Sequence, residues 1–134
     1  MKRLKISFLL SIIAILSIIL AGCNSEFAYI TENYEDKLVV HFIDVGQGDS
    51  TFIQFPNGET SLIDGGTRKS GEKVVEYLKD LDIEHIDYLI ATHPHEDHIG
   101  GLPKIIKNFD IGKVYMPNRT ANTLVFEELL KEIE

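Results

Sequence analysis

The sequence predicts an α/β (α+β layered) protein with a histidine cluster at one edge of its sheet, and three observations support this. Short β-branched runs alternate with amphipathic segments, which is the pattern of a layered α/β domain. Two of these runs, residues 38–43 and 87–91, are almost continuously apolar, which predicts a sheet buried on both faces. Three of the five histidines lie within six positions just after the second run, where the strand ends.

Residues 1–22 have the pattern of an export signal and are left out of the fold. Three basic residues lie within the first five positions, and an apolar run from Ile6 to Leu20 follows. The run is shorter than the roughly 20 apolar residues that a membrane span usually needs. Leu-Ala-Gly-Cys, ending at Cys23, resembles the bacterial lipobox. This resemblance implies that Cys23 is lipidated and becomes the mature N-terminus, on the extracytoplasmic face of a bacterial membrane.

Residues 23–36 are polar and acidic, which predicts a tether to a domain at residues 37–134. The chain carries 13 basic and 21 acidic residues, a net charge of −8. The first 22 residues hold three of the basic and none of the acidic ones, so ten basic against 21 acidic leave −11 for the remainder. Such a charge disfavours nonspecific nucleic-acid binding and binding to anionic headgroups. Cys23 is the single cysteine, so no intramolecular disulfide can form.

The first predicted strand covers residues 37–45 and carries Asp44 near its end. His41 lies inside it and is interpreted as an edge or core residue rather than a ligand. A glycine-bearing turn follows at residues 46–50. A phosphate-binding loop is a weak interpretation of this turn, because it lacks the Gly-Lys-Ser/Thr ending and leads into a strand.

A hairpin follows, with arms at residues 51–55 and 60–64 around the turn sequence Pro-Asn-Gly. An amphipathic helix is expected over residues 72–81, because its apolar residues recur at helical spacing. Ser70 is a candidate N-cap for this helix.

A strand over residues 86–92 delivers the histidine cluster at its C-terminal end. A helix should begin just behind the cluster, at residues 99–109, where Pro103 is tolerated only in the first turn. Residues 113–116 predict a short strand, and residues 123–134 a final amphipathic helix.

The cluster itself lies in the run THPHEDHIGGL. Pro94 disfavours the α region for His93, so His93 should be extended and share one side of the chain with His95. Asp97 and His98 follow where the chain turns toward a helix. Neutral imidazoles and a carboxylate are the ligands that zinc and similar divalent ions prefer. A polar loop that is merely histidine-rich is the alternative, but H-x-H-x-D-H supplies two ligand pairs at chelating spacing.

Three motifs occur in order: FIDVGQGDS at residues 42–50, LIDGG at 62–66, and the cluster at 92–102. Together they resemble the metallo-β-lactamase fold superfamily and, more narrowly, the hydrolase domain of ComEC-type competence DNA-uptake proteins. The resemblance implies an αββα sandwich with one or two divalent metals, zinc or alternatively manganese. This chain would supply the first half of that sandwich.

Carried over residue by residue, the resemblance implies that His93 and His95 bind the first metal. Asp97 and His98 would bind the second, and Asp97 would also be catalytic by orienting the attacking water. Asp64 would be the carboxylate behind the ligands that steadies the metal loop. The duties of Asp44 and Asp49 stay open between turn capping and function.

The implied activity is hydrolysis of phosphodiesters, with DNA as one candidate, by a metal-activated hydroxide at the cell surface. No histidine follows His98, whereas the family's second half supplies further ligands. We therefore expect a truncated chain with an incomplete site, which binds metal weakly and needs a second chain or a downstream half. The alternatives are a small-ester or nucleotide hydrolase, and an inactive metal-binding fragment.

Overall fold

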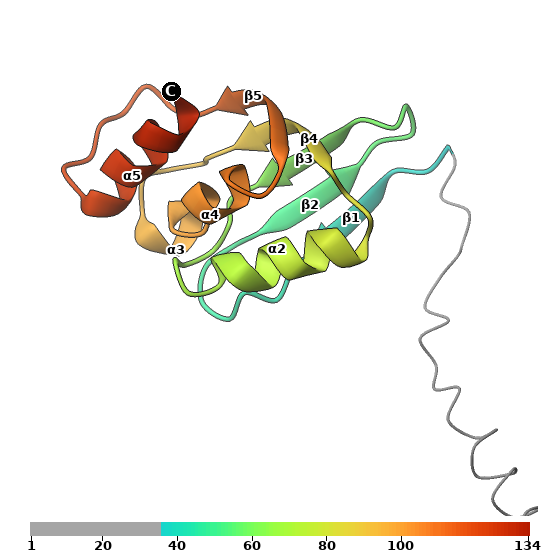
Figure 1. Ribbon diagram of the computed structural model, residues 1–134, viewed down its shortest axis with the longest axis horizontal. Helices are drawn as coiled ribbons and strands as arrows, with labels where there is room; N and C mark the ends of the chain where they lie inside the picture. Colours follow the sequence, from blue (N-terminus) through green and yellow to red (C-terminus); the bar gives the residue numbers. More distant parts are fainter. Residues whose placement is uncertain (1–35) are drawn as a thin grey trace, which may run out of the picture. The chain divides into compact units, whose positions relative to one another are not determined.

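The computed structural model describes residues 36–134, so the export signal, Cys23 and most of the tether lie outside the described residues. The elements of the described part are shown in Figure 1. In chain order they are β1 (Val39–Phe42), β2 (Thr51–Gln54), β3 (Thr60–Ile63), α2 (Gly71–Asp80), β4 (His85–Ile90), α3 (Glu96–Ile99), α4 (Leu102–Ile106), β5 (Asp110–Tyr115) and α5 (Leu124–Ile133). Over this range no helix has the length and apolarity that crossing a membrane requires.

The five strands form one mixed sheet in the order β1-β2-β3-β4-β5. β1, β2 and β3 are antiparallel neighbours, as the hairpin around residues 56–58 predicts. β3, β4 and β5 are parallel neighbours, and each parallel pair is joined by a connection that contains helix. The predicted α/β class is confirmed.

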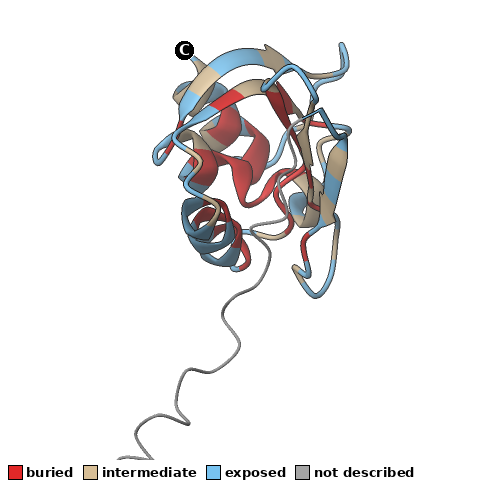
Figure 2. Cartoon of the chain, turned by 90° about the vertical axis from the view of Figure 1, so that its right-hand side faces the viewer, coloured by how far each residue is buried: buried red, intermediate tan, exposed pale blue. Residues whose placement is uncertain are grey.

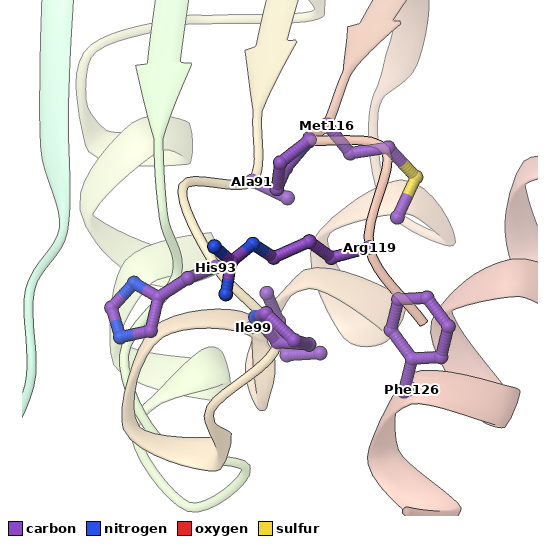
Figure 3. A pocket seen from close by; sticks show the side chains of 8 residues that line it. Ala91, His93, Ile99, Met116, Arg119 and Phe126 are labelled. Carbon is purple, nitrogen blue, oxygen red and sulfur yellow. The ribbon is translucent and has the colours of Figure 1, made fainter. Parts of the chain in front are cut away.

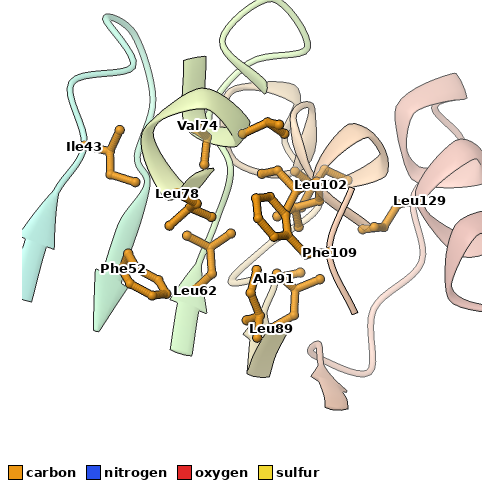
Figure 4. Close-up of a cluster of buried hydrophobic side chains, with 14 of the residues drawn as sticks. Ile43, Phe52, Leu62, Val74, Leu78, Leu89, Ala91, Leu102, Phe109 and Leu129 are labelled. Atoms are coloured by element: carbon orange, nitrogen blue, oxygen red, sulfur yellow. The ribbon is translucent and has the colours of Figure 1, made fainter. Parts of the chain in front are cut away.

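The hydrophobic core lies between the helices and one face of the sheet (Figures 2 and 4). Phe52, Leu62 and Leu89 are cross-strand partners on β2, β3 and β4, and all three are fully buried. Their partners across the layer are buried side chains of the helices: Val74, Val75, Leu78, Leu102, Ile105, Val125, Phe126 and Leu129. Each fully buried residue of this kind stabilises the fold by about 1.5–3 kcal/mol before the entropy cost of ordering it.

The opposite face of the sheet is open, so the prediction of a sheet buried on both faces is wrong for the described residues. Cross-strand partners point to the same side of a sheet. One row of cross-strand partners includes Val40 on β1 and Tyr88 on β4. The next row includes Phe42 on β1 and Tyr115 on β5. Phe42 is 84% exposed, and Val40 and Tyr115 are also exposed. The apolar runs therefore describe a sheet with a second apolar face that is uncovered here.

The helix predicted at residues 99–109 is instead two short helices, α3 and α4, and the first begins at Glu96. The break has a hydrogen-bond cause. The carbonyl of Asp97 accepts the Asp49 N–H at 3.3 Å, while the Gly101 N–H donates to the Gly66 carbonyl at 3.0 Å. Both groups would otherwise bond to each other within a continuous helix. Pro103 lies in the first turn of α4, as predicted.

Two predictions about single polar residues have different outcomes. Ser70 occupies the N-cap position of α2, but it makes no side-chain cap and instead donates its hydroxyl to the Thr67 carbonyl at 3.0 Å. That local bond competes with capping. His41 is confirmed as an edge-strand residue, because its ring nitrogens contact Tyr77 Oη at 2.9 Å and Gln54 Oε1 at 3.0 Å.

Candidate metal centre

The histidine cluster lies at a strand-to-helix junction, as the sequence predicts. β4 ends at Ile90, and the cluster spans the following loop and the first residues of α3. His95 is extended at the N-cap position of α3, with φ −89° and ψ 146°. The rings of His93 and His95 converge, with centroids 4.5 Å apart. The predicted convergence of the two rings is therefore confirmed, while the extended backbone at His93 and the ligand roles of these residues stay predictions.

Asp64 is the anchor of this junction. It follows β3 in the left-handed region, with φ +58°, which Asp tolerates better than most residues. It is 2% exposed, and its backbone N–H donates to the Ile90 carbonyl of the neighbouring strand at 2.9 Å. Its carboxylate accepts three hydrogen bonds: from the Thr92 N–H at 2.8 Å, from the Thr92 hydroxyl, and from His98 Nδ1 at 2.9 Å.

These bonds select the tautomers of two histidines. A carboxylate only accepts hydrogen bonds, so we place the His98 proton on Nδ1 and leave its Nε2 lone pair free. The Thr92 hydroxyl gives its proton to Asp64, so its oxygen accepts from His93 Nδ1 at 3.0 Å. His93 Nε2 is then free as well. One buried carboxylate thus fixes the tautomers of two imidazoles, one of them through Thr92.

The spacing of the rings decides which side chains can share a cation. Two imidazoles bound to one tetrahedral ion at about 2.0–2.1 Å have centroids roughly 5 Å apart. The His93 and His95 centroids, 4.5 Å apart, come close to this separation, whereas the His93 and His98 rings are only 3.9 Å apart and pack on each other. His98 Nε2 instead faces the Asp97 carboxylate at 3.9 Å. The donor chemistry therefore fits divalent metal as two pairs, His93 with His95 and Asp97 with His98.

No larger ligand set is assembled in the described part of the chain. Over residues 36–134, no group of three or more His, Cys, Asp or Glu side chains is arranged to hold a metal ion. A catalytic zinc site typically has three protein ligands and an open position for water. Each pair is one ligand short of that number.

The glycine-bearing turn before β2 supports the cluster through its backbone. Gly48 has φ +96°, and a Cβ placed there would lie 1.8 Å from the Asp97 carbonyl oxygen. The neighbouring Asp49 N–H donates to that same oxygen at 3.3 Å. The Asp49 side chain is 75% exposed, and its carboxylate lies 3.7 Å from His98 Nδ1. The motif therefore contributes a glycine that lets the turn approach α3 closely.

Asp44 has a structural duty in the same turn. Its Oδ1 accepts the Gly46 N–H at 3.1 Å, and its Oδ2 accepts from Lys73 Nζ at 3.1 Å. The hydrogen bond from Lys73, and then the one from Gly46, lower the pKa of this exposed carboxyl. Of the two duties left open by the sequence, turn capping is the one these contacts support.

Two hollows border the histidines. The larger has a volume of about 430 Å³ and is lined by Thr92, His93, Pro94, His95, Pro117, Arg119 and Thr120. The smaller is about 10 Å³, roughly the space of one water, and most of its lining is apolar, from Ala91, Ile99, Met116 and Phe126 (Figure 3). His93 and Arg119 line both hollows. Thr92 opens the cluster motif, which gives it no role of its own, and Arg119 belongs to no motif, so the sequence gives no signal for what either does at the site.

Comparison with known proteins gives a consistent result. The profile of the Metallo-beta-lactamase superfamily matches residues 43–132. ComE operon protein 3 of Bacillus subtilis is 33% identical over 109 residues, covering 69% of this chain and 14% of that protein. Ribonuclease J of Mycoplasma pneumoniae is 32% identical over 96 residues, covering 72% of this chain and 14% of that protein. Anti-Pycsar protein Apyc1 of Bacillus phage BSP38 is 38% identical over 81 residues, covering 58% of this chain and 30% of that protein. The chain thus spans less than a third of the length of each of these relatives.

Proposed function

Because the chain belongs to the metallo-beta-lactamase superfamily, we propose that its histidine cluster is a divalent-metal site for phosphodiester hydrolysis. The observation that carries the proposal is the buried Asp64 carboxylate, which holds His98 directly and His93 through Thr92. Partners behind the ligands that fix tautomer and ring orientation are typical of functional metal sites. A histidine-rich surface loop without this duty would have no need of a buried carboxylate.

The residues have distinct roles in this proposal. His93 and His95 hold one cation, and Asp97 and His98 hold a second; zinc is the first candidate and manganese the alternative. Bound there, a divalent cation supplies Lewis-acid activation of water and offsets charge on the substrate oxygens. The Asp97 side chain is partly exposed, so it can also accept a hydrogen bond from the attacking water and orient it.

Two features favour a phosphodiester over a small acyl ester. The hollow beside the histidines is lined by histidine, threonine and arginine side chains, and none of its described lining residues is acidic. The mostly apolar hollow next to it has space for about one water, which is too little for an acyl group. The relative named ribonuclease J is compatible with this substrate class. The net charge of −11 on residues 23–134, from ten basic and 21 acidic residues, favours a short nucleic-acid end or a nucleotide over long duplex DNA.

We also propose that further polypeptide completes the site, either as a downstream continuation or as a second chain. The open sheet face, with Val40, Phe42 and Tyr115 exposed, would be covered by a second sheet, since exposed apolar patches of this kind typically mark contact surfaces. The same polypeptide would add the ligands that the two pairs lack. The small share of each relative that this chain spans is compatible with the proposal.

The test measures metal binding and turnover separately. The chain should bind zinc weakly in a chelator-competition titration, and His95→Ala should weaken that binding at least about tenfold by removing one ligand of a pair. Hydrolysis of bis(p-nitrophenyl) phosphate should be low for the chain alone. It should rise when a second sheet with further ligands is supplied, and His95→Ala should abolish this gain.

Two outcomes would contradict parts of this proposal. Zinc binding that His95→Ala leaves unchanged would remove the cluster as the metal site. Strong, chelator-sensitive turnover by the isolated monomer would show that the site needs no partner. His41→Ala is the matched control, because His41 lies on the edge strand away from the cluster and should leave zinc binding unchanged.

We propose in addition that lipid on Cys23 holds the protein at the extracytoplasmic face of a bacterial membrane. The support is the lipobox-like tetrapeptide behind a charged and then apolar leader. Cys23→Ser should move the protein from the membrane fraction to the medium or block processing of the leader. Fractionation and intact-mass measurement test this, and unchanged retention with an unchanged mass would exclude lipid at this position.

A further inference from the structure

We propose that Arg119 is the phosphate-binding residue of this site, so that the centre accepts anionic phosphate esters in preference to neutral acyl esters. The inference deepens the proposed function and rests on it for the identity of the reaction. Phosphate binding by Arg119 is independent of the proposed function, because Arg119 would bind phosphate without a metal. The relevant surface is the hollow of about 430 Å³ between the loop after β4 and the loop after β5.

The composition of this hollow is unusual for the protein as a whole. The chain has 21 acidic residues against 13 basic ones, yet none of the described residues that line the hollow is acidic. Its polar side chains are Thr92, Thr120, His93, His95 and Arg119. A concave surface with hydroxyl and imidazole groups around one permanent cation is suited to an oxyanion.

Arg119 also differs from four other basic residues near the helices, each of which contacts a carboxylate. Arg68 forms a two-point ion pair with Glu128, at 2.8 and 3.0 Å. Lys73, Lys104 and Lys107 each contact a carboxylate, at 3.1, 2.6 and 2.9 Å. Within residues 36–134, no carboxylate lies in ion-pair contact with Arg119. Its guanidinium therefore keeps its hydrogen-bond donors available to a ligand.

The backbone directs this side chain toward the histidines. The Arg119 N–H donates to the Pro117 carbonyl at 2.7 Å, which closes a tight turn just after β5. From that turn the side chain runs toward His93, as Figure 3 shows, and both residues line the two hollows. A guanidinium has a planar fork of donors that matches two phosphate oxygens, which a lysine ammonium does not provide. A phosphate held there would lie beside the His93 and His95 pair.

The experiment measures binding of dimethyl phosphate and of inorganic phosphate to the full chain in detergent with EDTA present. The titration follows the imidazole NMR signals of His93 and His95. Arg119→Gln should weaken binding of both probes by about tenfold, because a charge-assisted, two-point hydrogen bond is lost. Arg119→Lys should retain only part of the phosphate affinity that Arg119→Gln loses. Lys131→Gln is the matched control: it removes the same unit charge from an exposed position in the last turn of α5 and should bind as the unchanged protein does.

Each result decides between alternatives. If Arg119→Gln binds phosphate as well as the unchanged protein does, Arg119 is not the phosphate site. If Lys131→Gln loses as much affinity as Arg119→Gln does, the effect is one of overall charge and the inference also fails. A zinc titration separates this from the proposed function. Phosphate binding that depends on Arg119, together with no zinc binding at the histidines, would overturn only the metal proposal, and the reverse result would overturn only this inference.

Discussion

Asp64→Ala should lower the free energy of unfolding by about 3 kcal/mol and weaken zinc binding by about 10- to 100-fold. The stability loss follows from burial. Asp64 is 2% exposed, and its removal leaves a space in the buried layer and takes the acceptor away from the Thr92 N–H and from His98 Nδ1. The loss of zinc affinity follows from tautomer control, because neither His98 nor His93 would then be held with Nε2 free.

The measurements are urea denaturation at neutral pH and zinc titration against a chelator. Asp64→Asn should keep much of the stability, since an amide oxygen still accepts the Thr92 N–H, but its other group donates to His98 Nδ1 and favours the wrong tautomer. Thr92→Val should leave the tautomer of His98 unchanged and affect only that of His93. Asp80→Asn is the control, because this exposed carboxylate at the end of α2 lies outside the three motifs and should change either quantity little. Equal effects of the Asp80 and Asp64 substitutions would contradict the role given to Asp64.

Gly48→Ala should lower the free energy of unfolding by about 3 kcal/mol and disorder the start of α3. Two costs combine here. The backbone at Gly48 has φ +96°, which is strained for any residue with a Cβ. The added methyl group would also lie 1.8 Å from the Asp97 carbonyl oxygen, and a backbone oxygen cannot move aside without moving the helix. Since Asp97 and His98 lie in that helix, zinc affinity should fall together with stability.

Gly46→Ala is the matched control for this substitution. Gly46 also has positive φ, at +78°, but nothing lies within 4 Å of a Cβ placed there. It should therefore show only the conformational cost, about 1 kcal/mol, and leave zinc binding unchanged. The pair of variants is compared by urea denaturation and by the same zinc titration. If both alanines cost the same, the close approach of the turn to Asp97 is not important for the cluster.

The three sequence motifs share one physical task. The first turn supplies Gly48 for the close approach to α3, and LIDGG supplies the Asp64 carboxylate. The backbone continues this support, because the Gly65 N–H donates to the His98 carbonyl at 2.8 Å. Residues far apart in the chain therefore converge on the few positions after β4. Substitutions at Gly48 and Asp64 should therefore change the same property, the position of the candidate ligands after β4.

Much of the secondary structure followed from local pattern. The hairpin was predictable because Pro-Asn-Gly sets a turn between two β-branched runs, and α2 because its apolar residues recur at helical spacing. The junction after β4 was predictable because the apolar run ends at Thr92 and Pro94 disfavours helix at His93. The single helix predicted behind the cluster was wrong, because Asp49 and Gly66, distant in sequence, take the hydrogen bonds that would have continued it.

The sequence by itself determined the α/β class and the strand-to-helix position of the histidine cluster, and it marked the candidate ligands within that cluster. These depend on periodicity, on turn chemistry and on residues within six positions of one another. Only the tertiary structure decided that Thr92 relays the Asp64 carboxylate to His93, that Arg119 faces the histidines, and that one sheet face is open. Each of these depends on which distant segments lie side by side. An apolar strand sequence does not show whether one face of its sheet is covered or both are.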